Sequence, residues 1–332
     1  MGIVDTISNL GPIHLGIFTS LFVIAGSKTI IDKKLSNDIK KIKDPKPILD
    51  KPVSQIQTDF IANHITDPLI DNCIVEFKNV IEGLVDKKYL TAFYRNINDL
   101  KVRRRINLNV FDKVAAYYNS TKNEIVLLDS RIRDVVFHEL FHLASSYINN
   151  EGEYIGFFQK NGKSVIGEGI NEGCTEWAAK EYFPGGINSY SFQTYVFSHI
   201  AKIIGDKKIF ELYFQADLKG LINEMSKYLD VDEVFTIING LDLYTKLDRK
   251  IIQASFLKFC HDYIENIQGI LLKMYINKHI DSFNDISNID IKQYAKDLDY
   301  TIYASDESFT YYLDDIDISK VVNKKLHLNM TI

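Results

Sequence analysis

The sequence predicts an α+β fold that is mainly helical, and three observations support this expectation. Apolar residues recur at helical spacing over Leu69–Val85, so one face of a helix is expected to be buried. Short runs of strand-forming residues predict small antiparallel hairpins between residues 115 and 166. After Gly185–Gly186 the chain returns to long amphipathic segments, which predict a helical C-terminal half: Phe192–Ile204, Ile209–Leu229 and Ile251–Ile276.

Two hairpins are expected within this helical framework. The first pairs residues 115–118 with residues 124–128 across a polar stretch. The second pairs residues 154–158 with residues 164–166 and turns at Asn161–Gly162, a dipeptide typical of tight turns.

The composition is that of a soluble globular protein, with 46% apolar and 25% charged residues in a chain of 332. The net charge of −5 gives no overall surface for a polyanion, so nucleic acid is not expected as a partner. The one dense basic cluster, Arg103–Arg105, is interpreted as a solvated strand face. Three widely spaced cysteines do not form a disulfide framework.

The chain divides into three predicted parts. Residues 1–27 form an apolar N-terminal segment, residues 28–53 a linker rich in lysine and proline, and residues 54–332 the folded domain. The apolar core of the first part, Ile13–Ala25, is shorter than the ~20 residues of a spanning helix. Two interpretations stay open: a membrane anchor with the domain on the cytoplasmic side, or a buried or interfacial helix of a cytoplasmic protein.

The motif His-Glu-x-x-His occurs once, at residues 138–142. On a helix, His138 and His142 lie one turn apart on the same face, so both imidazoles can reach one ion. Glu139 is rotated by about 100° from His138, which places it beside the metal without making it a ligand. Apolar residues around the motif support a helix here.

A second segment supplies carboxylates with the same spacing. Glu172 and Glu176 are four residues apart, so they share one face of a second expected helix. Zinc in hydrolytic sites takes three protein ligands and leaves one position for water. We assign Glu172 to the metal and Glu176 to a hydrogen bond with a ligand histidine.

The pairing of His-Glu-Leu-Phe-His with Asn-Glu-Gly-Cys-Thr-Glu resembles the gluzincin class of zinc metallopeptidases, the thermolysin-like superfamily. The resemblance covers roughly residues 115–182. It implies Zn²⁺ held by His138, His142 and Glu172, with Glu139 as general base. It also implies a zincin-like core with a small sheet on the active-site helix, a peptide or protein substrate, and a contact from Glu176 to His138. The family more often has aspartate at the position of Glu176.

Competing residues surround these assignments. Cys174 is a strong zinc ligand by chemistry but points about 200° away from Glu172 on a helix. Glu168 lies one turn before Glu172, but Gly169 favours a helix that starts after it. Three residues that follow are candidates for stabilising the oxyanion of the reaction: Tyr190, Tyr195 and His199.

Three functions remain after this reasoning. The leading one is a zinc-dependent peptidase, and the second is a non-catalytic, zinc-stabilised domain that binds or regulates partners. The third keeps the peptidase but restricts it to a narrow cleavage, such as that of a membrane-proximal protein. Neither the oligomeric state nor the cleavage specificity follows from the sequence.

Overall fold

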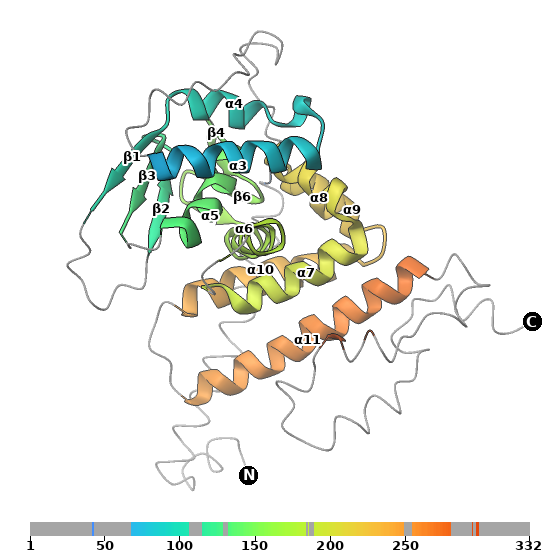
Figure 1. Ribbon diagram of the computed structural model, residues 1–332. Coiled ribbons are helices and arrows are strands. Elements are labelled where there is room, and N and C mark those ends of the chain that lie inside the picture. The colour runs from blue at the N-terminus through green and yellow to red at the C-terminus, as the bar shows by residue number, and fades with distance from the viewer. Residues whose placement is uncertain are drawn as a thin grey trace, which may run out of the picture.

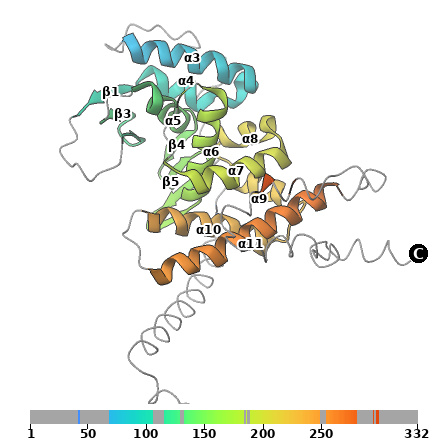
Figure 2. The ribbon, with the colours of Figure 1, turned by 60° about the horizontal axis from the view of Figure 1, so that its bottom comes forward.

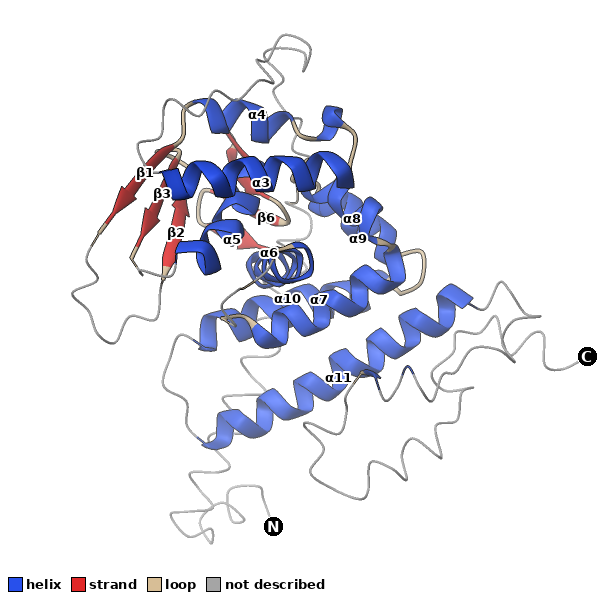
Figure 3. Ribbon diagram, in the orientation of Figure 1, coloured by secondary structure: helices blue, strands red, loops and turns tan. Residues whose placement is uncertain are grey.

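The computed structural model describes residues 42, 68–105, 115–128, 132–183, 185, 189–248, 254–279, 294, 297 and 298. The α-helices are α3 (Pro68–Leu84), α4 (Thr91–Asn98), α5 (Ile132–Ala144), α6 (Glu168–Tyr182), α7 (Ser191–Ile204), α8 (Asp206–Tyr213), α9 (Leu218–Met225), α10 (Val231–Asp248) and α11 (Ala254–His279). The strands are β1 (Lys101–Arg104), β2 (Ala116–Asn119), β3 (Glu124–Leu127), β4 (Ser146–Asn149), β5 (Gly152–Ile155), β6 (Phe158–Asn161) and β7 (Ser164–Ile166). The expected class, α+β and mainly helical, is confirmed (Figure 3).

The predicted N-terminal parts fall outside this description. Residues 1–27 are not among the described residues, and of the predicted linker 28–53 only Ile42 is. Among the helices that the structure describes, none combines the length and the apolar character needed to cross a membrane.

The first sheet has the strand order β1-β3-β2, so among the described strands β1 and β2 are its two edges. Strand β2 pairs antiparallel with β3, which confirms the first predicted hairpin, and β1 adds in parallel on the other side of β3. The basic cluster lies on and just after β1, where Arg103 forms an ion pair with Glu124 of β3. The strand assignment is therefore confirmed for Arg103 and Arg104, and Arg105 directly follows the strand.

The second sheet differs from the expected single hairpin. It is an antiparallel meander of four strands, β4-β5-β6-β7. The turn at Asn161–Gly162 joins β6 to β7 as predicted, but residues 154–158 do not form one strand. The chain reverses at Gly156, whose φ of +53° is easily adopted only by glycine, and this turn separates β5 from β6.

The elements form layers around helix α6. Figure 1 shows α6 end-on at the centre, with α5 and α3 on one side and α7 and α10 on the other. Helix α11 is the outermost helix on the side of α7 and α10 in both Figure 1 and Figure 2. Helix α5 packs against α3, α4 and α6, and it also contacts β2. The two helices with the predicted site therefore meet in the interior.

The C-terminal half is helical as expected, with two corrections to its boundaries. The predicted segment Ile209–Leu229 is two helices, α8 and α9, because Ala216 between them adopts a positive φ of +53°. Helix α10 was not predicted. It contains Asn239–Gly240, a pair that favours turns, but Ile237, Ile238 and Leu241 are fully buried against the rest of the fold.

Two glycines of α6 allow neighbouring backbones to approach closely. A Cβ at Gly169 would lie 2.2 Å from the carbonyl carbon of Leu241 on α10. A Cβ at Gly173 would lie 2.5 Å from the carbonyl oxygen of Gln193 on α7. Real Cβ atoms do not come this near to backbone atoms. The position of α6, and hence of Glu172, is fixed by these two contacts.

We expect Gly169→Ala to lower the free energy of unfolding by about 1–3 kcal/mol, because the added methyl group must push α10 away from α6. Gly83→Ala is the matched control. Gly83 is exposed on α3 with nothing within 4 Å of its Cβ position, so alanine there should stabilise by roughly 0.5–1 kcal/mol. Urea denaturation of the two variants measures both effects, and equal shifts in the two variants would contradict the close-packing argument.

Candidate metal centre

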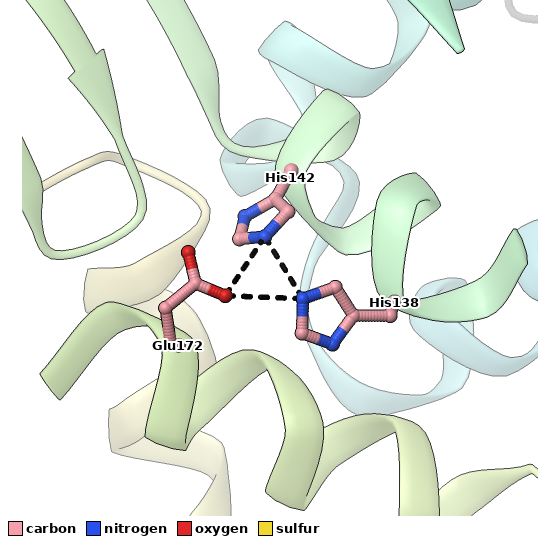
Figure 4. A group of neighbouring side chains, drawn as sticks. All are labelled: His138, His142 and Glu172. Atoms are coloured by element: carbon pink, nitrogen blue, oxygen red, sulfur yellow. Dashed lines mark hydrogen bonds and ion pairs between the residues drawn. The ribbon is translucent and has the colours of Figure 1, made fainter. Parts of the chain in front are cut away.

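The two histidines of the motif lie one turn apart on α5 and face α6 (Figure 4). The opposite side of α5 is anchored in the core by Val136, Leu140 and Phe141, all fully buried. The Nε2 atoms of His138 and His142 are 3.1 Å apart. Two ring nitrogens at this distance are close enough to ligate one ion.

Glu172 of α6 completes the group. Its Oε2 atom lies 3.2 Å from Nε2 of His138 and 3.5 Å from Nε2 of His142. Zinc–ligand distances of about 2.0–2.1 Å in a tetrahedron place ligand atoms roughly 3.3 Å apart. The three observed separations lie around this value, and two imidazoles with one carboxylate form a donor set that zinc accepts. The residues therefore fit the ion.

The charges around the group favour a cation at its centre. Burial lowers the pKa of His138, but its hydrogen bond to the carboxylate of Glu172 and the charges of the nearby carboxylates raise it more. Burial alone would raise the pKa of Glu172. The charges and hydrogen bonds of His142 and His138 outweigh this and hold the pKa of Glu172 well below its usual range. The carboxylate thus stays ionised and ready to ligate.

Glu139 lies next to the group without belonging to the converging atoms. Its side chain is buried, and burial raises its pKa above the usual value. His138 and His142 oppose that shift, and so does a hydrogen bond with the backbone of Tyr118 on β2. A carboxylate whose pKa is raised by burial binds a proton more readily than an exposed one.

Asn171 is a site residue that the sequence reasoning missed. Its Nδ2 lies 3.5 Å from Nδ1 of His142, and its Oδ1 accepts a hydrogen bond from the N–H of Phe157 at 3.0 Å. Gly156 leaves room for this side chain, since a Cβ there would lie 2.3 Å from Oδ1 of Asn171. Asn171 therefore lies against Nδ1 of His142, the ring nitrogen that does not face Glu172. The sequence feature that could have indicated Asn171 is its position directly before Glu172.

A distant side chain fixes the start of α6. Asp242 of α10 accepts hydrogen bonds from the N–H groups of Gly167 (2.8 Å) and Gly169 (2.7 Å). Gly167 is the N-cap residue and has no side chain for this purpose, so the carboxylate of Asp242 replaces a local cap and complements the helix dipole. No local sequence signal indicates this contact, because the two partners are more than 70 residues apart.

Glu176 does not make the contact that the family resemblance implies. It is buried one turn after Glu172, and its hydrogen bonds go to Lys180, to the backbone N–H groups of Ser189 and Tyr190, and to Thr194. In the part of the chain that the structure describes, none of its hydrogen bonds goes to His138. The carboxylate of Glu176 binds the backbone of the segment that leads into α7.

The three oxyanion candidates lie in different places. The ring of Tyr190 stacks on that of His138, with 6.0 Å between ring centroids and 17° between ring planes. The hydroxyl of Tyr195 donates to the carbonyl of Leu298, and Nδ1 of His199 lies 3.3 Å from the hydroxyl of Tyr294. Of the three candidates, Tyr190 is thus the one that lies against a metal-ligand candidate.

Neither competing ligand joins the converging atoms, which within the described ranges are those of His138, His142 and Glu172 alone. Cys174 is fully buried, and burial raises the pKa of its thiol well above the usual value. Glu168 is the first residue of α6, so the expectation that the helix starts after it is wrong. The N–H groups that Asp242 binds explain why the helix includes Glu168 in spite of Gly169.

His199 provides a pH test of this part of the fold. Burial lowers its pKa to about 4, the charge of Lys202 adds to the shift, and Asp297 partly opposes it. The unfolded chain takes up the proton near pH 6.5, so stability is lost as the pH falls from about 6.5 to 4, by on the order of 3 kcal/mol. We expect His199→Gln to remove this part of the pH dependence.

Urea denaturation of the wild type and of His199→Gln between pH 7 and pH 4 measures the effect. Acid release of a bound metal acts on both proteins, so the difference between their two curves isolates His199. Parallel curves over this range would contradict the assignment.

Comparison of this chain with protein families, with curated proteins and with solved structures finds no match. The interpretation of the centre therefore rests on its residues and their geometry.

Proposed function

We propose that this chain is a zinc-dependent peptidase of gluzincin type, with a zincin-like core. The observation that carries the proposal is the spacing of the three donor atoms of His138, His142 and Glu172, at 3.1, 3.2 and 3.5 Å. A set of two imidazoles and one carboxylate is that of hydrolytic zinc sites, which keep a fourth position open. The ligand side chains are 12–16% exposed, so the group is in contact with solvent.

The three-ligand set favours catalysis over a purely structural zinc. Structural zinc sites are closed by four protein ligands, whereas three groups converge here within the described residues. Glu139 also retains the position and burial of a general base. A non-catalytic, zinc-stabilised domain does not require that residue.

Each residue has a role in hydrolysis of a peptide bond. When bound, zinc lowers the pKa of water toward neutrality and polarises the substrate carbonyl. Glu139 accepts a proton from the attacking water and delivers it to the nitrogen of the leaving amine. Tyr190 is positioned beside His138, from where its hydroxyl donates a hydrogen bond to the developing oxyanion.

Strand β2 is suited to hold an extended substrate. The N–H of Leu128 donates to the carbonyl of Ala115, which sets the alternation of the β2–β3 ladder. Ala116 and Tyr118 therefore direct their backbone N–H and C=O groups away from β3, at the edge of the sheet. Because the backbone of Tyr118 also contacts Glu139, a peptide added along this edge passes the base.

The test is zinc stoichiometry of the purified full-length chain together with cleavage of an unstructured peptide library. We expect one zinc per chain, cleavage that a chelator abolishes, and recovery on addition of zinc. A protein that binds no zinc contradicts the proposal. Tight zinc binding with no cleavage, together with global unfolding on zinc removal, favours the non-catalytic alternative.

A further inference from the structure

Helix α6 carries a second buried carboxylate, whose bonding pattern is unlike that of a histidine-orienting residue. The side chain of Glu176 is 3% exposed. Its Oε2 accepts hydrogen bonds from the N–H groups of Ser189 (3.1 Å) and Tyr190 (3.0 Å). Its Oε1 accepts from Lys180 (2.8 Å) and from the hydroxyl of Thr194 (3.3 Å). Both oxygens are thus engaged by the helix itself and by the chain entering α7.

These bonds fix the backbone directly before α7. Ser189 and Tyr190 immediately precede the first residue of α7, and Tyr190 is its N-cap residue, without a side-chain capping bond. The carbonyl of Tyr190 accepts the N–H of Thr194 (2.8 Å), so Glu176 binds both ends of this first turn. Charge-assisted hydrogen bonds to backbone N–H groups are among the stronger ones in proteins. The backbone position of Tyr190 therefore depends on Glu176.

The side chain of Tyr190 extends from this fixed backbone to the metal-ligand candidates. Its ring lies nearly parallel to the imidazole of His138, with 6.0 Å between centroids. Glu172 and Glu176 are one turn apart on the same helix, so α6 supplies a metal ligand directly and places a tyrosine indirectly.

We propose that Glu176 is a positioning residue: by holding the N–H groups of Ser189 and Tyr190, it keeps the Tyr190 side chain beside His138 for contact with the substrate carbonyl. The proposal rests on the proposed function for the part that Tyr190 plays. It differs from the family pattern, in which this carboxylate contacts the histidine itself. Glu176 would thus stabilise the transition state by holding the backbone of Ser189 and Tyr190, and it would not change the affinity for zinc.

The experiment compares wild type, Glu176→Gln, Tyr190→Phe and the double variant in the full-length, zinc-loaded protein. Glutamine has one acceptor oxygen in place of two and no charge, so its NH₂ group must face either the backbone N–H donors or the ammonium of Lys180. We expect each single variant to lower kcat by roughly 10- to 100-fold with little change in KM, because the lost contact forms in the transition state. The double variant should be no slower than the slower single variant, since both changes remove the same contact.

Two further measurements do not depend on activity. Amide hydrogen exchange at Ser189 and Tyr190 should accelerate at least ~10-fold in Glu176→Gln and stay unchanged in Tyr190→Phe, since only the first variant weakens their bonds. Zinc affinity, measured by competition with a chromogenic chelator, should stay within about threefold of wild type. A residue that orients a ligand histidine would instead change it 10- to 100-fold. Glu181→Gln, which removes an exposed carboxylate from the same helix, is the control.

The outcomes separate this proposal from the proposed function. Multiplicative losses in the double variant, or a large loss of zinc affinity with unchanged amide exchange, overturn the positioning role. If Glu176→Gln does not fold, Glu176→Asp keeps the charge beside Lys180 and replaces it in every measurement. If the wild type cleaves no peptide, the proposed function fails. The role of Glu176 is then tested by amide exchange and zinc affinity without any activity assay. Faster amide exchange in Glu176→Gln with unchanged zinc affinity supports the anchoring of the backbone by Glu176, and unchanged amide exchange overturns it.

Discussion

Replacing Glu139 with glutamine should abolish peptide hydrolysis while the protein still binds one zinc ion. The side chain is not among the converging ligand atoms, so its replacement should not change the affinity for zinc. Glutamine has the same size, and its carbonyl can keep the hydrogen bond with the backbone of Tyr118. It cannot accept a proton from water. We expect kcat to fall by at least ~10²–10⁴-fold, the usual contribution of a general base, with a smaller change in KM.

The measurement is steady-state hydrolysis of one library-derived peptide, with zinc content determined on the same preparation. Glu168→Gln serves as the control, because it changes a carboxylate that stands outside the converging group. It should retain both zinc and activity. A Glu139→Gln protein that keeps more than a tenth of wild-type kcat would exclude Glu139 as the base, and another acceptor would then have to be found near β2.

The placement of the two motif histidines depends only on helical periodicity. His138 and His142 are four residues apart on α5 and share one face, as the spacing of the motif predicts, whereas Glu172 meets them because α6 packs against α5. The helix of the histidine motif was recognisable because apolar residues surround it. Local spacing is sufficient for the histidine pair, since one helix presents both rings.

The roles that were missed depend on contacts between distant segments. The sequence places Glu176 on the correct helix, but its partners are set by the path of the chain before α7. Asp242 binds the start of α6 from a helix that the sequence did not predict at all. Helix α10 forms against the turn preference of Asn239–Gly240 because its apolar face is buried. Tertiary packing outweighs local propensity in such places.

Two changes of chain direction, at Gly156 and at Ala216, were also not predicted from the sequence. Gly156 separates β5 from β6 in what reads as one continuous apolar strand, and its positive φ also leaves the space that Asn171 needs. Ala216 breaks a regular amphipathic pattern between α8 and α9, although alanine strongly favours helices. Glycine permits the positive φ at Gly156, and Asp217 caps α9 directly after Ala216, but neither residue alone predicts that the chain changes direction there.

Replacing Glu172 with glutamine should lower zinc affinity by more than about 100-fold, the largest effect expected for metal binding from any single change in α6. The loss of a direct ligand should exceed the 10- to 100-fold loss that follows from changing a residue behind a ligand. The neighbouring histidines hold the pKa of Glu172 low, so it is the negative charge that balances the cation, and glutamine removes this charge. Chelator competition gives the affinity.

Thermal unfolding at increasing zinc concentration gives a second, independent measure, because an ion that binds only the folded state raises the melting temperature as its concentration exceeds the dissociation constant. The rise should begin at a zinc concentration at least ~100-fold higher in Glu172→Gln than in the wild type. Glu168→Gln and Cys174→Ser test the two competing ligands and should follow the wild-type curve. If Cys174→Ser instead loses zinc while Glu172→Gln keeps it, the ligand set is wrong. The centre would then contain a thiolate, which is more typical of structural zinc than of a hydrolytic site.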